Sequence, residues 1–153
     1  MKISPLIRQA VKEDLQQVLE VYRGLTEDTD DTISVNEAEK KFEKLKSYPD
    51  YKVYVAEYEK KIIGTFALLI MDNLAHRGEP SAIVEDVVIR NEWQGKGIGK
   101  EMMKYAMNIS RQKGCYKMVL SSHLRRERAH KFYESLGFKK HGFSFEIELS
   151  AAE

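Results

Sequence analysis

Residues 85–100 read EDVVIRNEWQGKGIGK and decide the fold of this 153-residue chain. The segment begins with an apolar run and continues into a turn that contains three glycines: Gly95, Gly97 and Gly99. Beyond the turn, apolar residues recur at helical spacing as far as about residue 112, which indicates an amphipathic helix. The segment therefore predicts a strand, a glycine-rich turn and a helix in immediate succession.

The glycine-rich turn has the properties of an anion-binding site. A helix N-terminus carries unpaired N–H groups and a partial positive charge, which favour phosphate, and glycines let the backbone approach closely. Lys96 and Lys100 add positive charge. The spacing fits neither a dinucleotide-binding fingerprint, which needs glycine at position 100 or 102, nor a P-loop, which needs Ser or Thr after its lysine. Considered alone, the turn is also compatible with having no ligand.

The rest of the chain alternates strand and helix patterns. Short apolar runs predict strands at residues 3–9, 51–58, 62–71, 82–89 and 116–120, with one or two more within 138–149. Amphipathic spacing predicts helices at about residues 11–22, 34–46, 98–112 and 126–136. Ser34 and Glu37 form a capping box at the start of the second helix. This order predicts a mixed α/β (α+β) fold with a central, mostly antiparallel sheet of six to seven strands and about four helices.

Composition narrows the class of protein. The length predicts a single domain, residues 1–153. The net charge is +1, with 25 basic and 24 acidic residues, so neither nucleic acid nor an anionic membrane is expected as the main partner. The single cysteine, Cys115, excludes an intrachain disulfide and is typical of the cytoplasm. The N-terminus lacks a signal-peptide pattern, and the longest apolar run, 62–71, is about half of the ~20 residues that a membrane span needs.

The charge is unevenly distributed along the chain. Residues 111–140 carry nine basic and two acidic side chains. This is either a solvated basic face or a site for a phosphorylated ligand. A nucleic-acid-binding surface is a weaker third interpretation, because Trp93 has no aromatic partner in the sequence on which bases would stack.

Two motifs resemble those of the GCN5-related N-acetyltransferase (GNAT) family. Gln94-x-x-Gly97-x-Gly99 is similar to the pyrophosphate loop of that family, Q/R-x-x-G-x-G/A. About 30 residues further on, residues 129–138 read AHKFYESLGF and resemble the family segment A-x-x-F-Y-x-x-x-G-F. The order of the predicted elements along the whole chain is also similar to the GNAT fold. The resemblance implies acetyl-CoA as co-substrate.

The resemblance also implies roles for particular residues. The loop amides would hold the pyrophosphate of acetyl-CoA, and the strand before the loop, kinked away from residues 116–121, would pair its backbone with the pantetheine arm. These cofactor-binding residues are Val87, Val88, Ile89, Gln94, Gly95, Lys96, Gly97, Ile98, Gly99 and Lys100. Tyr133 would protonate the departing thiolate, since a phenol with a pKa near 10 is protonated at neutral pH. From spacing alone, Tyr133 would be a packed aromatic side chain.

Arg126 stands where the family often has an asparagine, seven residues before the tyrosine. The surrounding segment, residues 123–133, resembles the aminoalkylphosphonate acetyltransferase branch, and other segments resemble glucosamine-6-phosphate acetyltransferases. Both branches acetylate amines that carry a phosphorus oxyacid. We therefore expect that Arg126 contacts a cofactor phosphate instead of taking over the role of the asparagine.

Two carboxylates interrupt the apolar strand that precedes the loop. Glu85 is the preferred base for withdrawing the amine proton through water, and Asp86 is the second choice. Strand alternation predicts that the two point to opposite faces. Structural hydrogen bonding by both is the alternative interpretation.

The sequence thus predicts an N-acetyltransferase that moves the acetyl group of acetyl-CoA directly to the primary amine of a small molecule. The alternatives are an acyl-CoA-binding regulatory module without turnover and a protein or peptide N-acetyltransferase. Four acids within residues 27–31 favour a cationic acceptor, whereas the basic residues 123–128 favour an anionic one, and this choice stays open. No metal is expected, because the four histidines do not cluster with Cys115. A homodimer is expected from the family.

Overall fold

The computed structural model describes residues 2–24 and 32–149. The chain divides into two compact units, Met1–Leu120 and Ser121–Glu153, and each is described by itself. The acidic segment 27–31, on which the expectation of a cationic acceptor depends, lies outside the described residues. Within the described part of the chain, no helix is both long and apolar enough to cross a membrane.

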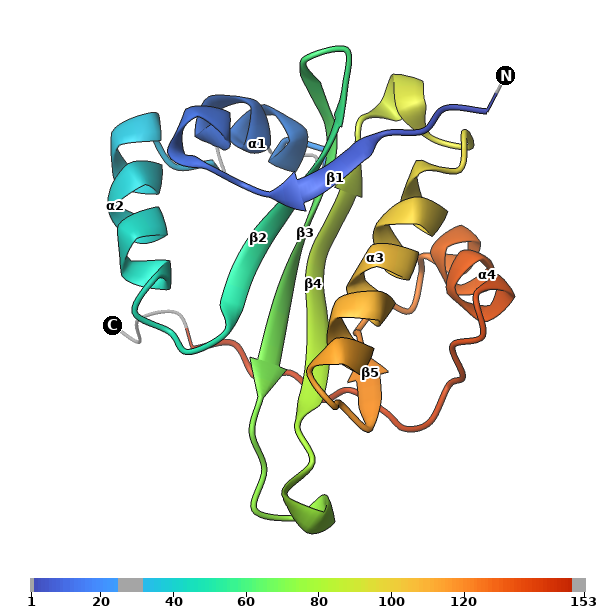
Figure 1. Ribbon diagram of the computed structural model, residues 1–153. Helices are drawn as coiled ribbons and strands as arrows, with labels where there is room; N and C mark the ends of the chain where they lie inside the picture. The colour runs from blue at the N-terminus through green and yellow to red at the C-terminus, as the bar shows by residue number, and fades with distance from the viewer. Residues whose placement is uncertain (1, 25–31, 150–153) are drawn as a thin grey trace. The chain divides into compact units, whose positions relative to one another are not determined.

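The first unit contains a five-stranded sheet in sequence order (Figure 1). Its strands are β1 (Leu6–Gln9), β2 (Tyr51–Tyr58), β3 (Lys61–Met71), β4 (Ser81–Ile89) and β5 (Lys117–Val119). Neighbouring strands are antiparallel except β4 and β5, which are parallel. The fold is therefore the predicted mixed α/β fold with a mostly antiparallel sheet, with five strands instead of six to seven.

Helices of the first unit cover both faces of the sheet (Figure 1). They are α1 (Leu15–Tyr22), preceded by the 3₁₀ turn η1 (Lys12–Asp14), then α2 (Val35–Leu45) and α3 (Ile98–Gln112). Two further 3₁₀ turns, η2 (His76–Gly78) and η3 (Asn91–Trp93), lie in loops. The predicted capping box at the start of α2 is confirmed, because the Glu37 N–H donates to Ser34 Oγ and the Ser34 N–H donates to the Glu37 carboxylate.

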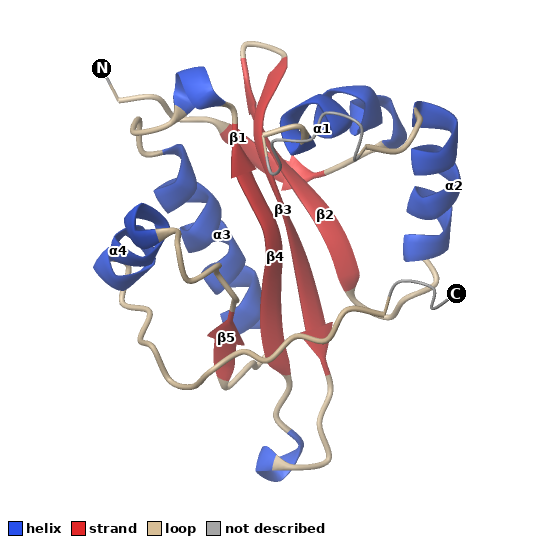
Figure 2. Ribbon diagram, turned by 180° about the vertical axis from the view of Figure 1, so that it is seen from behind, coloured by secondary structure: helices blue, strands red, loops and turns tan. Residues whose placement is uncertain are grey.

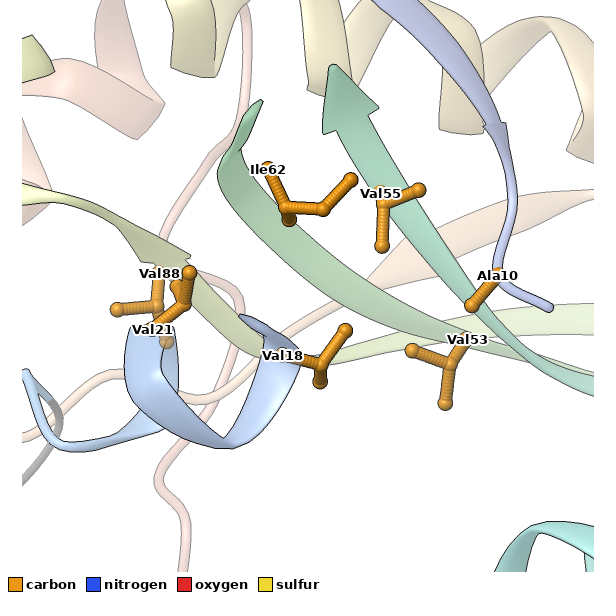
Figure 3. Packing of buried hydrophobic residues seen from close by; sticks show 7 residues of the cluster. All are labelled: Ala10, Val18, Val21, Val53, Val55, Ile62 and Val88. Carbon is orange, nitrogen blue, oxygen red and sulfur yellow. The ribbon is translucent and has the colours of Figure 1, made fainter. Parts of the chain in front are cut away.

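Strand alternation divides the core between the two faces of the sheet. Val53 and Val55 of β2 point to the face that Val18 and Val21 of α1 cover, and Val88 of β4 joins the same cluster (Figure 3). Tyr54 points to the opposite face, where it stacks on Phe66 with a centroid distance of 5.1 Å and meets the edge of Tyr105 of α3. The sheet is thus packed on both faces, and α3, which begins at the glycine-rich turn, covers one of them.

The second unit contains α4 (Glu127–Ser135), close to the predicted bounds. The strands predicted within residues 138–149 are absent from the described residues, and this prediction is wrong (Figure 2). Four apolar side chains alternate there with polar ones, and all are between 79% and 92% exposed: Phe143, Phe145, Ile147 and Leu149. A strand also needs a neighbouring edge to satisfy its backbone groups, and alternation in the sequence cannot supply that edge.

Candidate active site

A β-bulge interrupts β4 at the two acidic residues. The register passes from Thr65 opposite Val88 to Ala67 opposite Glu85, so that two steps along β3 correspond to three along β4. Asp86 has a φ of 52°, in the left-handed region that side chains other than glycine rarely adopt. An extra residue of this kind bends and twists the strand. The predicted kink in β4 is therefore present, and its position is Asp86.

The bulge coincides with a separation of β4 from β5. The two strands pair only over Ser81–Ile83 and Lys117–Val119, and no described strand pairs with this edge of β4 beyond Ile83. The second half of β4 therefore presents backbone N–H and C=O groups on one edge. An extended ligand with amide groups can add to such an edge as a further strand does.

The free edge of β4 leads to the N-terminus of α3. Gly97 is the N-cap residue with a φ of 84°, and no side chain caps the helix. Gly97 is exposed, and a Cβ atom built on it would meet no atom within 4 Å outside its chain neighbours, so the N-cap position itself is open. Ile98 is buried at the first position of α3. This arrangement anchors the helix in the core while its first N–H groups face an open, positively polarised site.

Two side chains hold the loop between β4 and α3 in shape. The Gln94 side-chain amide donates to the Ile89 carbonyl at 3.1 Å, which folds Gln94 back onto its own loop. Arg90 donates from Nε to the Ile62 carbonyl at 2.7 Å and forms an ion pair with Glu20 of α1 at 3.0 Å. Both side chains shape the loop. Of the predicted loop residues, Ile98 and Gly99 are buried, and the others are exposed: Gln94, Gly95, Lys96, Gly97 and Lys100.

The bulge lies at the two carboxylates that are the candidate bases. Both Glu85 and Asp86 are exposed, and the prediction that they point to opposite faces stays a prediction. Burial raises the pKa of the Tyr51 phenol, and the charges of both carboxylates, that of Asp86 more strongly, raise it further. Both carboxylates are therefore close enough to Tyr51 for their charges to act on its phenol.

Two tyrosines beside the carboxylates were not predicted as site residues. Burial raises the pKa of Tyr22 at the end of α1 to about 12, and the charge of Asp86 contributes. Tyr51 begins β2. In the sequence, Tyr22 is one apolar position of an amphipathic helix and Tyr51 is one aromatic residue of a strand. Their proximity to Asp86 depends on how α1 and β2 pack around β4, and no local pattern could have revealed it.

The predicted acid and Arg126 both belong to the second unit. Tyr133 of α4 meets the edge of Phe138 at a centroid distance of 5.6 Å. Burial raises the pKa of its phenol, and the nearby charge of Arg126 opposes this rise. Arg126 is the N-cap residue of α4 and accepts a hydrogen bond from the His130 N–H. Within this unit, Tyr133 is therefore a phenol that stays protonated at neutral pH, with a guanidinium in its vicinity.

The described residues contain no group of three or more His, Cys, Asp or Glu side chains that could hold a metal ion. The expectation that the reaction needs no metal stays a prediction.

Comparison with known proteins agrees with this geometry. The model of the acetyltransferase (GNAT) family matches residues 15–138, and the chain belongs to that family. Acetyl-CoA is the co-substrate that the family implies.

Individual relatives give a finer picture. The chain is 35% identical over 98 residues to glucosamine 6-phosphate N-acetyltransferase of Trypanosoma brucei brucei, a match that covers 64% of this chain and 65% of that protein. It is 26% identical over 150 residues to aminoalkylphosphonate N-acetyltransferase of Salmonella typhimurium, which covers 88% of this chain and 94% of the relative. A crystal structure of an acetyltransferase from Trypanosoma brucei has a TM-score of 0.83 at 28% identity and covers 95% of this chain and all of the other.

Proposed function

We propose that this protein transfers the acetyl group of acetyl-CoA to the primary amine of a small molecule. The observation that carries the proposal is the continuous path from the bulged, unpaired edge of β4 to the open, uncapped N-terminus of α3. Pantetheine amides match the strand edge, and a pyrophosphate matches the helix terminus. The cofactor residues are those predicted, with Val88 and Ile98 contributing backbone groups, since their side chains are buried in the core.

In the proposed reaction, the amine attacks the thioester carbon directly while both reactants are bound. A C–N bond forms, the C–S bond breaks, and the amine proton passes through water to Glu85 or Asp86. Tyr133 gives its proton to the thiolate of CoA, and its raised pKa keeps that proton available at neutral pH. Holding the reactants together supplies much of the acceleration, because effective molarities reach about 10⁵–10⁸ M.

We further propose that the acceptor carries a phosphate or phosphonate group. The named relatives act on glucosamine 6-phosphate and on aminoalkylphosphonates, two amines that share this chemistry. The excess of basic residues in the segment 111–140 supports an anionic acceptor as well.

A panel of amines tests the acceptor class. Glucosamine 6-phosphate is compared with glucosamine, and 2-aminoethylphosphonate with ethylamine, so that each pair differs only by the phosphorus group. Release of the CoA thiol is followed in each case. The phosphorus-containing member of each pair should show the higher kcat/KM. Equal values within both pairs would refute the acceptor class while leaving acetyl transfer intact. Enzyme alone is the blank, because the protein itself contains a free thiol, Cys115.

Two variants separate binding from turnover. Gly97→Asp places a side chain and a negative charge where the pyrophosphate is proposed, and it should abolish the rise in Tm that acetyl-CoA produces. Unchanged binding would refute the loop assignment.

Glu85→Gln removes the basicity of this carboxylate, so the rate at neutral pH should fall and part of it should return at higher pH. If CoA binds and no amine releases thiol, the acyl-CoA-binding regulatory module is the better interpretation.

The remaining expectations are proposals of the same kind. The family match extends across the boundary between the two units, which supports a single catalytic domain over residues 1–153.

The four exposed apolar side chains of residues 143–149 support a homodimer in which this segment is covered. Light scattering of the wild type and of Phe145→Glu tests this, and a monomeric wild type would refute it. Neither nucleic acid nor a membrane is proposed as a partner, and a cytoplasmic location rests on the single cysteine.

A further inference from the structure

The loop that we propose for the cofactor contains a cation–π pair. Lys96 Nζ lies 4.8 Å from the centroid of the Trp93 ring. An ammonium group over the face of an indole is attracted by the negative potential of the ring. Lys96 follows Gly95 and precedes the N-cap residue of α3, so the pair places a positive charge beside the open helix terminus.

The indole ring is held by the sheet. Tyr58, the last residue of β2, meets the Trp93 ring edge to face at a centroid distance of 5.3 Å. The neighbouring residue Glu92 forms an ion pair with Lys61, the first residue of β3, at 3.1 Å. The end of the β2–β3 hairpin therefore contacts η3 at two adjacent positions. A ring that is fixed in this way is a rigid platform for a side chain that would otherwise move freely.

A fixed platform matters because lysine has a long, flexible side chain. Pinning such a side chain on a ligand costs up to about 2 kcal/mol of rotamer entropy, and a ring that already restricts it removes part of that cost. The ammonium has three N–H donors, and the ring covers only one side of it. The remaining donors can reach an anion in front of α3.

We propose that Trp93 is a positioning residue, which holds the Lys96 ammonium at the α3 terminus for a phosphate group of CoA. This inference rests on the proposed function, because it takes CoA as the ligand of the loop. The indole N–H is covered and has no hydrogen-bond acceptor among the described residues. Trp93→Phe therefore leaves a smaller aromatic ring under Lys96 without breaking a hydrogen bond, whereas Trp93→Leu removes the aromatic ring altogether.

Calorimetric titration with CoA tests the coupling between the two side chains. Trp93→Leu should weaken binding about two- to fivefold, which corresponds to an exposed cation–π pair, and Trp93→Phe should weaken it less. Lys96→Met should weaken binding at least as much as Trp93→Leu, and adding Trp93→Leu to Lys96→Met should cost nothing more. If Trp93→Leu is as costly without Lys96 as with it, Trp93 acts by packing alone and the proposal is overturned.

Titration with 3′-dephospho-CoA identifies which phosphate Lys96 meets. A Lys96→Met penalty that persists with this ligand assigns Lys96 to the pyrophosphate, and one that disappears assigns it to the 3′-phosphate; both agree with the proposal. Lys60→Met is the matched control, because Lys60 lies in the turn of the neighbouring hairpin and is not the cation over Trp93. An equal penalty in Lys60→Met would overturn the proposal in favour of a general charge effect.

Tryptophan fluorescence tests the pair without any ligand. Trp93 is the single tryptophan of the chain, so the emission reports on this site alone. Lys96→Met should change the emission of the free protein at an unchanged Tm, and Lys60→Met should not. This arm remains informative if the wild type fails to bind CoA, a result that would refute the proposed function. Identical emission of the wild type and Lys96→Met would overturn the inference itself.

Discussion

Asp86 combines a strained backbone with a candidate catalytic carboxylate, and substitution separates the two properties. Its φ of 52° lies in the left-handed region, where a Cβ atom costs about 1–2 kcal/mol. Aspartate and asparagine tolerate this region through local hydrogen bonds, glycine has no Cβ, and alanine has neither advantage. The three variants Asp86→Gly, Asp86→Asn and Asp86→Ala all lose the charge but differ in strain.

The expected stabilities follow from these two terms. Relative to alanine, glycine stabilises the folded state by about 1–2 kcal/mol, because it avoids the strain of a Cβ atom. The greater conformational freedom of the unfolded glycine chain offsets about 0.5–1 kcal/mol of this. Asp86→Gly should therefore be more stable than Asp86→Ala by roughly 0.5–1 kcal/mol, and Asp86→Asn should stay close to the wild type. For a chain of this length, that difference lowers the Tm of the alanine variant by about 1–4 °C relative to glycine.

Thermal melts and thiol release on the same samples complete the experiment. If Asp86 is the base, all three variants lose turnover at neutral pH in spite of their different Tm values, and Glu85→Gln keeps most of its turnover. If Glu85 is the base, Asp86→Asn keeps its kcat. Equal Tm values for the glycine and alanine variants would refute the strain argument, and full activity in all three would exclude Asp86 from catalysis.

Three further predictions concern other parts of the chain. Tyr133→Phe should lower kcat by about 10²-fold with little change in the affinity for acetyl-CoA. Because burial raises the pKa of Tyr133, the rate of the wild-type enzyme should not fall on the alkaline side of its pH profile below about pH 10. Gly64→Ala would place a Cβ 2.8 Å from Met102 Sδ, so unfolding in urea should show a loss of about 1–2 kcal/mol that shrinks in a Met102→Ala background. The Arg8 guanidinium hydrogen-bonded to Asp14 holds the pKa of that carboxyl below its usual 3.8, so its stabilisation is present above that value and is lost as the pH falls below it. Urea melts should show Asp14→Asn about 1–2 kcal/mol less stable at pH 7, with the difference shrinking as the pH falls below about 4. An unchanged kcat in Tyr133→Phe would contradict the first prediction. The second would be contradicted if Gly64→Ala cost as much in the Met102→Ala background as in the wild type, and the third if the stability difference between Asp14→Asn and the wild type did not depend on pH.

The elements that the sequence predicted correctly depend on interactions within a few residues. The capping box of Ser34 and Glu37 joins groups three positions apart, and the start of α3 follows from the glycine turn before it. The helical spacing of residues 98–112 likewise needs only one face of a helix to be apolar. The two family motifs are local as well, which is why the amino-acid sequence by itself indicates the family.

The tertiary structure alone decided the features that join distant segments. The left-handed conformation of Asp86 arises where β4 pairs with β3, and the charge of Asp86 acts on Tyr22 of α1 and on Tyr51 of β2. The position of Trp93 between Tyr58 and Lys96 likewise joins a hairpin to a loop that is remote from it in the sequence. The alternating residues 143–149 have the pattern of a strand without forming one in the described chain. In each case the deciding partner is distant along the chain, and only the folded structure determines whether it is present.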